Sequence, residues 1–405
     1  MLARNAACIA LAIISVDLLV ARGAGQNTQS AQNLAATPVY QAVLDALRVV
    51  QDKFAPDTKR AIFEIKCRQD GKTITLEGDV DSPAAKHAAL AAVQAAGWDV
   101  SDRITVLPAA DLGDRVWGIA TKSLANMRVR PFAENSRDMA TQAFMGSVLR
   151  VWKRQTNAQN DGQPNWYLVQ TADEYLSWTD GSSFAACTRE QAEAWKAAPL
   201  LIVTVFEGQI VKEPLTNAAT ISDVVQCDLV KRVGMEGDWF KVELPDGRVG
   251  YLTRKSAADY AAWRGERRLT AENIERTARL YLDRPYLWGG ISWRGLDCSG
   301  FTKLVYYLNG MDLNRDAVEQ CRQGIEVPLD NNLKPLKKGD LLFFGEAASG
   351  TSPERITHTA IYLQDKEFIQ AFGTVHVSSL DPASPLADRR HIDTLIHARR
   401  LLREP

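Results

Sequence analysis

The sequence lacks the features that identify several large classes of protein. It has 48 basic and 49 acidic side chains in 405 residues, so the formal net charge is −1, and no run of basic residues stands out. This balance gives no indication of nucleic-acid binding or of attachment to a membrane surface. The chain also has no phosphate-binding loop, no dinucleotide fingerprint and no CxxC or HExxH sequence. We therefore expect no zinc site and no cofactor.

Cysteine is scarce, with six residues in the chain. Cys8 lies close to the N-terminus, and the other five are Cys67, Cys187, Cys227, Cys298 and Cys321. If Cys298 stays free, the remaining four allow three pairings, and the sequence does not choose among them. Their irregular spacing does not resemble a disulfide scaffold.

The first 25 residues are typical of an export signal. Arg4 supplies positive charge, the segment from Ala6 to Ala21 is largely apolar, and residues 23–25 are small enough for cleavage. The apolar segment is short and is interrupted by Asp17, so it is a poor candidate for a membrane span. We expect a signal peptide over residues 1–25 and a mature protein in the periplasm or cell envelope. An ordinary short N-terminal helix is the alternative.

The length and the hydrophobic fraction of 46% predict two to four domains with real cores. The first domain is expected over residues 38–108, with the order αββαβ. A helical pattern covers residues 40–54, a strand pair surrounds the Asp70-Gly71 turn, and an alanine-rich helix precedes a last strand at 98–106. This order resembles the small BON-like domains of bacterial envelope proteins, and it carries no chemistry.

The middle of the chain contains an internal repeat. Trp166-Tyr167-Leu168-Val169 is followed by Tyr175-Leu176, and Trp239-Phe240-Lys241-Val242 is followed by Tyr251-Leu252. Short alternating strands at this spacing predict two small β-barrels. They resemble bacterial SH3-like domains and are expected over residues 112–185 and 200–255, with a helical connector at 188–198.

A candidate nucleophile lies at residues 297–301, where the sequence is DCSGF. The glycine-rich loop at 288–290 precedes it, and the apolar spacing of residues 302–308 predicts a helix after it. Asp297 suits the N-cap, so Cys298 would lie at the positive end of the helix dipole, which favours a thiolate. A free cysteine can equally be a small buried hydrophobe.

A histidine downstream is a candidate base. Residues 356–363 and 367–372 read as two strands joined by a polar turn. If Leu363 pairs with Glu367, paired positions sum to 730, and His358 and Gln370 share a face of the sheet as diagonal neighbours. Gln370 could then bond one imidazole nitrogen and leave the other for the cysteine. A register slip of one residue would put the two on opposite faces, and a lone strand histidine is otherwise a packing residue.

These segments carry a resemblance to a known family. The sequence RPYLWGGISWRGLDCSGF at 284–301, the segment KGDL at 338–341 and the His358 strand resemble the NlpC-type bacterial cell-wall cysteine peptidases. The resemblance covers about residues 268–402 and implies a papain-like α+β catalytic domain in a multi-domain α+β protein. Within the family, the chain is similar to γ-D-glutamyl-L-diamino acid endopeptidases that carry bacterial SH3-like domains ahead of the catalytic domain.

The resemblance assigns catalytic roles to single residues. Cys298 matches the nucleophile and His358 the general base. Gln370 matches the third position, which is often histidine in the family. A glutamine can orient a neutral imidazole, but it cannot carry a compensating negative charge. Tyr286 matches an active-site tyrosine whose hydroxyl helps to stabilise the oxyanion, although it could be a packing aromatic beside Pro285.

Four further residues match positions that bind the free N-terminal L-alanine of the substrate peptide. Ser299 and Asp316 are the candidates in the catalytic domain, where an acidic residue gives an ammonium its countercharge. Asp316 could equally be a helix N-cap. Tyr175 and Asp138 are the candidates in the first SH3-like domain, where both could be ordinary surface or packing residues. Glu174 replaces a glycine that is common beside this tyrosine.

The resemblance therefore implies a cysteine endopeptidase that hydrolyses the γ-D-glutamyl–L-diamino acid bond of peptidoglycan stem peptides with a free N-terminal L-alanine. His358 would take the proton of Cys298, or the two would already form an ion pair. If the first barrel blocks the groove, only short peptides fit, as in murein peptide recycling. The alternatives are an N-acetylmuramoyl-L-alanine amidase, a thiol-dependent acyltransferase, or an inert wall-peptide-binding protein. Diaminopimelate and lysine both remain open as the diamino acid.

Overall fold

The computed structural model describes residues 38–132, 135–156, 165–330 and 332–402. The export signal predicted over residues 1–25 therefore lies outside the described residues. The chain divides into two compact units: one holds the chain up to Gly113 together with Trp152–Arg154, and the other holds the rest. Within the residues described, none of the helices combines the length and the apolarity that crossing a membrane requires.

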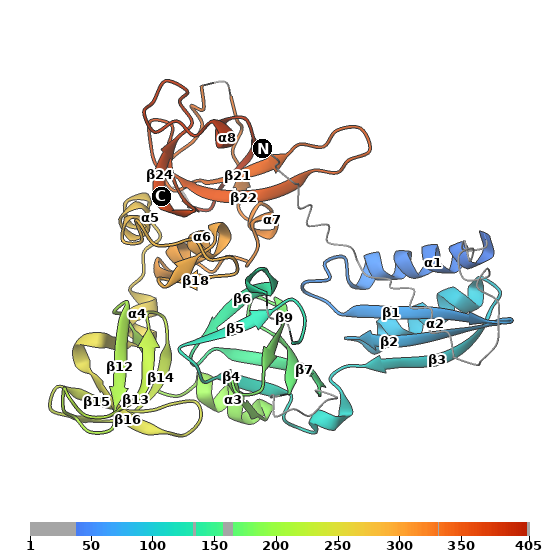
Figure 1. The fold of residues 1–405 in the computed structure, drawn as a ribbon, viewed down its shortest axis with the longest axis horizontal. Helices are drawn as coiled ribbons and strands as arrows, with labels where there is room; N and C mark the ends of the chain where they lie inside the picture. The colour runs from blue at the N-terminus through green and yellow to red at the C-terminus, as the bar shows by residue number, and fades with distance from the viewer. Residues whose placement is uncertain (1–37, 133–134, 157–164, 331, 403–405) are drawn as a thin grey trace, which may run out of the picture. The chain divides into compact units, whose positions relative to one another are not determined.

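The first unit has the predicted element order, two helices and three strands. Strand β1 pairs with β2 in antiparallel fashion, and β2 pairs with β3 in parallel fashion. The helices pack on each other and on the sheet, and their apolar side chains enclose a core with Ile74 and Leu76. Ser82 caps the second helix, because its side chain accepts the Ala85 N–H. The bounds are α1 (Pro38–Phe54), β1 (Phe63–Asp70), β2 (Thr73–Val80), α2 (Pro83–Ala95) and β3 (Asp99–Val106) (Figure 1).

The second unit begins with a seven-stranded sheet whose order is β10-β4-β7-β8-β9-β5-β6. The first half of the repeat that begins at Trp166 forms its β8–β9 hairpin. Residue Glu174, just before β9, has a left-handed backbone with φ of 65°, which explains why glycine is common there. The bounds are β4 (Trp117–Ala120), β5 (Leu124–Arg128), β6 (Met139–Phe144), β7 (Val148–Gln155), β8 (Trp166–Gln170), β9 (Leu176–Asp180) and β10 (Phe184–Cys187).

A second seven-stranded sheet has the order β13-β12-β16-β15-β14-β11-β17. In reverse, this order is β17-β11-β14-β15-β16-β12-β13. Each strand number is seven higher than the number at the same place in the first sheet, so the two sheets share one topology and the sequence repeat is also a structural repeat. In the described residues the pairing does not close either sheet, so the SH3-like barrels stay a prediction. The bounds are β11 (Leu200–Val203), β12 (Glu207–Val211), β13 (Thr220–Val225), β14 (Leu229–Glu236), β15 (Trp239–Glu243), β16 (Val249–Thr253) and β17 (Ala257–Asp259).

Helix α3 (Arg189–Lys196) joins the two sheets, as predicted. Thr188 and Gln191 form a capping box at its start, which satisfies N–H groups of the first turn and the cap. Helix α4 (Tyr260–Gly265) follows the second sheet.

The C-terminal part of the second unit is a six-stranded sheet with the order β20-β25-β21-β22-β23-β24, which α6 contacts at β22 and β23. The side chains of Phe301 and Val305 on α6 join Phe343 and Ile361 of the sheet in one buried core. The bounds are α5 (Ala271–Arg279), β18 (Ile291–Ser292), β19 (Gly295–Leu296), α6 (Cys298–Leu308), α7 (Ala317–Gln320), β20 (Ile325–Glu326), β21 (Leu341–Glu346), β22 (Arg355–Tyr362), β23 (Glu367–Phe372), β24 (Thr374–Ser379), α8 (Arg389–Ile392) and β25 (Leu395–Arg400) (Figure 1).

The cysteines of the described residues are all free thiols, so none of the three pairings left open by the sequence forms. Four are buried, and only Cys67 is partly exposed.

Candidate active site

The candidate nucleophile opens helix α6, as the sequence predicted. Asp297 is the N-cap residue, with an extended backbone (φ −88°, ψ 178°), and its Oδ1 accepts the Gly300 N–H at 2.7 Å. Its Oδ2 accepts the Gly289 N–H at 2.9 Å, so one carboxylate ties the glycine-rich loop to the helix start. Gly300 has no room for a side chain, because a Cβ there would lie 2.1 Å from the Gly290 oxygen. The loop and the helix therefore hold Cys298 in one position.

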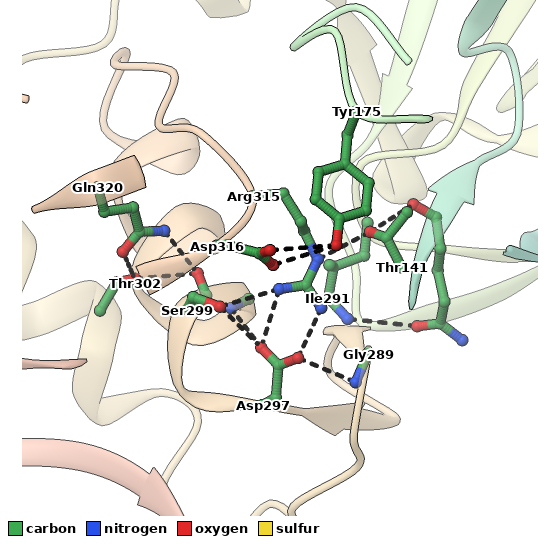
Figure 2. A network of polar contacts seen from close by, with 12 residues as sticks. Thr141, Tyr175, Gly289, Ile291, Asp297, Ser299, Thr302, Arg315, Asp316 and Gln320 are labelled. Carbon is green, nitrogen blue, oxygen red and sulfur yellow. Dashed lines mark hydrogen bonds and ion pairs between the residues drawn. The ribbon is translucent and has the colours of Figure 1, made fainter. Parts of the chain in front are cut away.

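A buried arginine, which the sequence reasoning missed, organises this cap (Figure 2). Arg315 binds both carboxylate oxygens of Asp297, with Nη2–Oδ2 at 2.6 Å and Nη1–Oδ1 at 3.1 Å, and its side chain is only 2% exposed. Its Nη1 also donates to Ser299 Oγ at 2.9 Å, and its Nε donates to Thr141 Oγ1 of β6 at 2.8 Å. The guanidinium fork thus links the first seven-stranded sheet to the residues on both sides of Cys298. Arg315 directly precedes the candidate Asp316, and this was the signal in the sequence that could have identified Arg315 as part of the site.

The predicted strand register is confirmed. Ile361 pairs with Ile369 and Tyr362 with Phe368, so paired positions sum to 730. His358 and Gln370 are both buried and joined by a hydrogen bond of 2.7 Å between His358 Nε2 and Gln370 Oε1. Since Oε1 can only accept, the Nε2 of His358 carries the proton. The Nδ1 of His358 is then the unprotonated nitrogen.

The sulfur lies against the histidine strand. The backbone N–H of Thr359, the residue after His358, and that of Ser299 both lower the pKa of the Cys298 thiol, so they lie close to its sulfur. Helix α6 packs on β22 along this line. The tertiary structure therefore brings together the cysteine and the strand of the histidine, which are sixty positions apart in the sequence.

The thiol and the imidazole are both neutral near pH 7. Burial raises the pKa of Cys298 to about 12, and the Asp297 carboxylate adds to this rise. Burial lowers the pKa of His358 to about 3, and the nearby His391 adds to this decrease. The helix start was expected to favour the thiolate, whereas burial and the neighbouring Asp297 charge raise the pKa of Cys298 and favour the neutral thiol. The same shifts disfavour a pre-formed ion pair.

Tyr286 lies in the electrostatic neighbourhood of the sulfur. Burial raises the pKa of its hydroxyl, and the neighbouring Cys298 and the carboxylate of Asp297 raise it further. The backbone of Tyr286 is fixed by a hydrogen bond of 2.8 Å from its N–H to the Gly373 oxygen and by a bridge to Leu296. The hydroxyl therefore remains a hydrogen-bond donor at every physiological pH.

Two of the predicted amine-binding residues meet directly. Tyr175, which precedes β9 in the first sheet, donates its hydroxyl to the carboxylate of Asp316, at 3.2 and 3.3 Å from the two oxygens. Asp316 is also the N-cap residue of α7, so the alternative interpretation of this residue holds as well. Ser299 is buried, and its hydroxyl accepts from Arg315 and lies 3.3 Å from Asp297 Oδ1. Figure 2 shows Tyr175, Asp316, Arg315 and Ser299 converging in one network.

The last candidate, Asp138, forms an ion pair of 3.0 Å with Arg130, whose side chain is 68% exposed. Asp138 ends the short 3-10 helix Ser136–Asp138 and is itself only 17% exposed. It therefore lies directly before β6, outside the strands of the first sheet.

Polar residues behind Gln370 were also missed by sequence reasoning. The Nε2 of Gln370 donates to Ser378 Oγ at 2.9 Å and to Asp388 Oδ2 at 3.0 Å. The same Asp388 oxygen lies 2.6 Å from Nδ1 of His391. Ser378 lies on β24, the hairpin partner of β23, whereas Asp388 and His391 come from the segment at α8, which no pairing rule connects to β23 before the chain is folded.

Comparison with known proteins matches these features to one family. The model of the NlpC/P60 family matches residues 283–394. A gamma-D-glutamyl-L-lysine dipeptidyl-peptidase of Bacillus subtilis (strain 168) is 38% identical over 132 residues, which are 32% of this chain and 40% of that protein. Dipeptidyl-peptidase 6 of Lysinibacillus sphaericus is 31% identical over 249 residues, which are 58% of this chain and 83% of that protein.

A solved structure of an NlpC/P60 family protein from Bacillus cereus ATCC 10987 has the same fold over 70% of this chain and 99% of that one, with a TM-score of 0.56 at 22% identity. The match to the dipeptidyl-peptidases of B. subtilis and B. cereus spans about two fifths of the length of those relatives, 40% and 38%.

Proposed function

The chain belongs to the NlpC/P60 family of peptidases, and on this basis we propose that it is a cysteine endopeptidase specific for the γ-D-glutamyl–L-diamino acid bond of peptidoglycan stem peptides. The proposed substrates carry a free N-terminal L-alanine. The observation that carries the proposal is the packing of helix α6, which begins at Cys298, against strands β22 and β23, which hold the hydrogen-bonded His358–Gln370 pair, beside the Tyr175–Asp316 contact.

Two neutral groups carry out the chemistry. As the sulfur of Cys298 attacks the γ-carbonyl carbon of D-glutamate, its proton passes to Nδ1 of His358. Gln370 accepts from Nε2 throughout and so keeps Nδ1 directed to the reaction. The imidazolium then gives its proton to the amine of the departing diamino acid, which breaks the C–N bond and leaves a thioester. Water, deprotonated by His358, hydrolyses the thioester and restores the thiol.

The oxyanion develops close to backbone donors. The Ser299 and Thr359 N–H groups both lower the pKa of the Cys298 thiol, and the first turn of α6 presents further N–H groups to this region. The raised pKa of Tyr286 keeps its hydroxyl protonated, so it can donate as well. Each such donor acts more strongly in a buried site than in water.

The specificity rests on residues that come from the first sheet and from the catalytic domain. An ammonium group needs acceptors and a countercharge, and the carboxylate of Asp316 supplies both while Tyr175 fixes its orientation. Ser299 offers a further hydroxyl, and Asp138 is a candidate for a second acidic contact. Relatives named gamma-D-glutamyl-L-lysine dipeptidyl-peptidase match this chain in part, which favours substrates of the same kind.

We also propose the cellular setting and the domain roles. The domains expected at 112–185 and 200–255 are bacterial SH3-like, and their repeated strand order supports this assignment. The domain at 38–108 is BON-like and serves packing or attachment. The protein is exported to the periplasm or cell envelope, where it acts on released wall peptides.

The experiment that tests the proposal is product analysis by mass spectrometry. The protein should release the diamino acid from L-Ala-γ-D-Glu-diaminopimelate or from the lysine analogue, and Cys298→Ala should abolish this release. Acetylation of the L-alanine nitrogen should prevent cleavage, because it removes the positive charge. Cleavage of the acetylated peptide would disprove the amine pocket, and release of L-alanine from muramoyl peptides would favour an amidase instead.

A further inference from the structure

We propose that Asp388 is a positioning residue that fixes the side-chain amide of Gln370 in the one orientation in which His358 can act as a base. This inference rests on the proposed Cys298–His358 site. It concerns a residue that lies outside the segments singled out in the sequence, at the N-cap of α8.

The amide of Gln370 is fully buried and has partners on both sides. Oε1 accepts from His358, while Nε2 donates to Ser378 Oγ and to Asp388 Oδ2. An amide has nearly the same shape when its oxygen and nitrogen are exchanged, so hydrogen-bond partners alone decide which atom faces the imidazole.

Of the two side chains that lie within 3.0 Å of Nε2, only Asp388 can make that decision. The Ser378 hydroxyl can donate or accept, so it would satisfy either orientation of Gln370. An ionised carboxylate can only accept. Burial alone would raise the pKa of Asp388, but hydrogen bonds from His391 and Gln370 outweigh it and hold the pKa below its usual value. Asp388 is therefore ionised at neutral pH, and it requires the NH₂ group on its side of the amide.

The opposite orientation of the amide would stop the reaction. The NH₂ group would then face Nε2 of His358, which could bond it only after losing its proton. In a neutral imidazole that proton would move to Nδ1, the nitrogen that must receive the proton of Cys298. Nδ1 of His358 could then not accept the proton of Cys298, although no residue of the site is missing.

The surroundings of Asp388 predict that asparagine does not replace it. Oδ2 accepts from both Gln370 and His391 Nδ1, and Oδ1 accepts the backbone N–H of His391. An asparagine that keeps its oxygen at the helix N–H must turn its NH₂ group toward Gln370, which favours the inactive orientation. Two further titratable or charged side chains near Gln370 and His358 are His376, 3.5 Å from Gln370 Nε2, and Arg390, whose charge also lowers the pKa of His358.

The arrangement also supplies what a glutamine lacks. Gln370 is neutral, whereas the imidazolium formed during catalysis is stabilised by a nearby negative charge. The carboxylate of Asp388 provides that charge from behind Gln370, without touching the imidazole. It is already among the influences that raise the pKa of His358.

The test exchanges the two side chains. Asp388→Asn should lower kcat for tripeptide cleavage about 10- to 100-fold, which is the change in rate that corresponds to the loss of one charge-assisted hydrogen bond. The double variant Gln370→Glu/Asp388→Asn should recover most of that loss. The carboxylate introduced by Gln370→Glu accepts from His358 in either orientation, and the amide introduced by Asp388→Asn can donate to that carboxylate. The acidic limb of kcat/KM for the double variant should lie at higher pH than in the unmodified protein, since a carboxylate now contacts the imidazole.

Asp393→Asn is the matched control, because it removes one carboxylate from the exposed C-terminal end of the same helix and should leave kcat unchanged. A kcat for Asp388→Asn equal to that of the unmodified protein, or a double variant no faster than Asp388→Asn, would overturn the inference. The rate of alkylation by iodoacetamide at pH 7 gives the same comparison without a peptide substrate. If Cys298→Ala still cleaves the tripeptide, the proposed function fails. If Cys298→Ala is inactive while kcat of Asp388→Asn is unchanged, only the present inference fails.

Discussion

Substitution of Arg315 by methionine should reveal how strongly the buried ion pair stabilises the start of helix α6, where the candidate nucleophile lies. Arg315 is 2% exposed and Asp297 10% exposed, and two short hydrogen bonds join them. Burial alone would lower the pKa of Arg315, but the charge of Asp297 more than compensates and raises it above its usual value. Methionine has a similar length and no charge, so the variant leaves the carboxylate of Asp297 without its counterion.

The expected loss is large. Breaking a buried pair by removing one partner costs about 3–5 kcal/mol, because the remaining charge stays buried and uncompensated. At about 2–4 °C per kcal/mol for a domain of this size, the melting temperature should fall by about 6–20 °C. A second substitution, Asp297→Asn, should restore part of this loss, since a neutral amide can still accept the Gly300 N–H.

Calorimetry of the three proteins would measure the effect. Arg279→Met is the control, since Arg279 is 42% exposed and its partner Glu275 keeps a second ion pair with Lys338. An exposed pair of this kind contributes less than about 1 kcal/mol, so its melting temperature should change by less than about 4 °C. If Arg315→Met changes the melting temperature no more than this control, the reasoning about the buried pair is refuted.

The site also allows three shorter predictions. Because the pKa of Cys298 is raised to about 12 and that of His358 is lowered to about 3, deprotonation of the thiol increases with pH through the neutral range. Alkylation of Cys298 by iodoacetamide should therefore rise about tenfold per pH unit from about pH 6 to about pH 9, and a plateau below pH 7 would instead reveal an ion pair. Asp316→Asn should raise KM for the free-amine tripeptide about 10- to 100-fold with little change in kcat, through loss of a charge-assisted hydrogen bond; unchanged KM would contradict its role. Gly300→Ala should destabilise the protein by about 1–3 kcal/mol, because its Cβ would lie 2.1 Å from the Gly290 oxygen, and an unaltered melting temperature would contradict this.

Local patterns predicted much of the fold. The αββαβ order, the connector helix α3 and the β22–β23 register follow from periodicity, caps and short turns, which act over a few residues. The repeat of tryptophan and tyrosine segments likewise indicated two related sheets. Their strand order could not be read from the sequence, since it depends on which distant strands pair.

The candidate site divides in the same way. The sequence identified Cys298, His358 and Gln370, because each lies in a short segment of distinctive chemistry. It missed Arg315 and Asp388, whose roles come from side chains that reach across the structure. It also misjudged the ionisation of Cys298, because a dipole can be predicted from a helix start whereas burial cannot.

The order of the amino acids already indicated which elements form, since hydrogen bonding within helices, hairpins and caps is local. It also indicated the candidate residues for the chemistry. The protonation and orientation of those residues came only from the folded chain. Both depend on desolvation and on charges contributed by segments far apart in the sequence, such as Asp388 behind Gln370 and Arg315 behind Asp297. These long-range interactions do not exist until the segments have packed together.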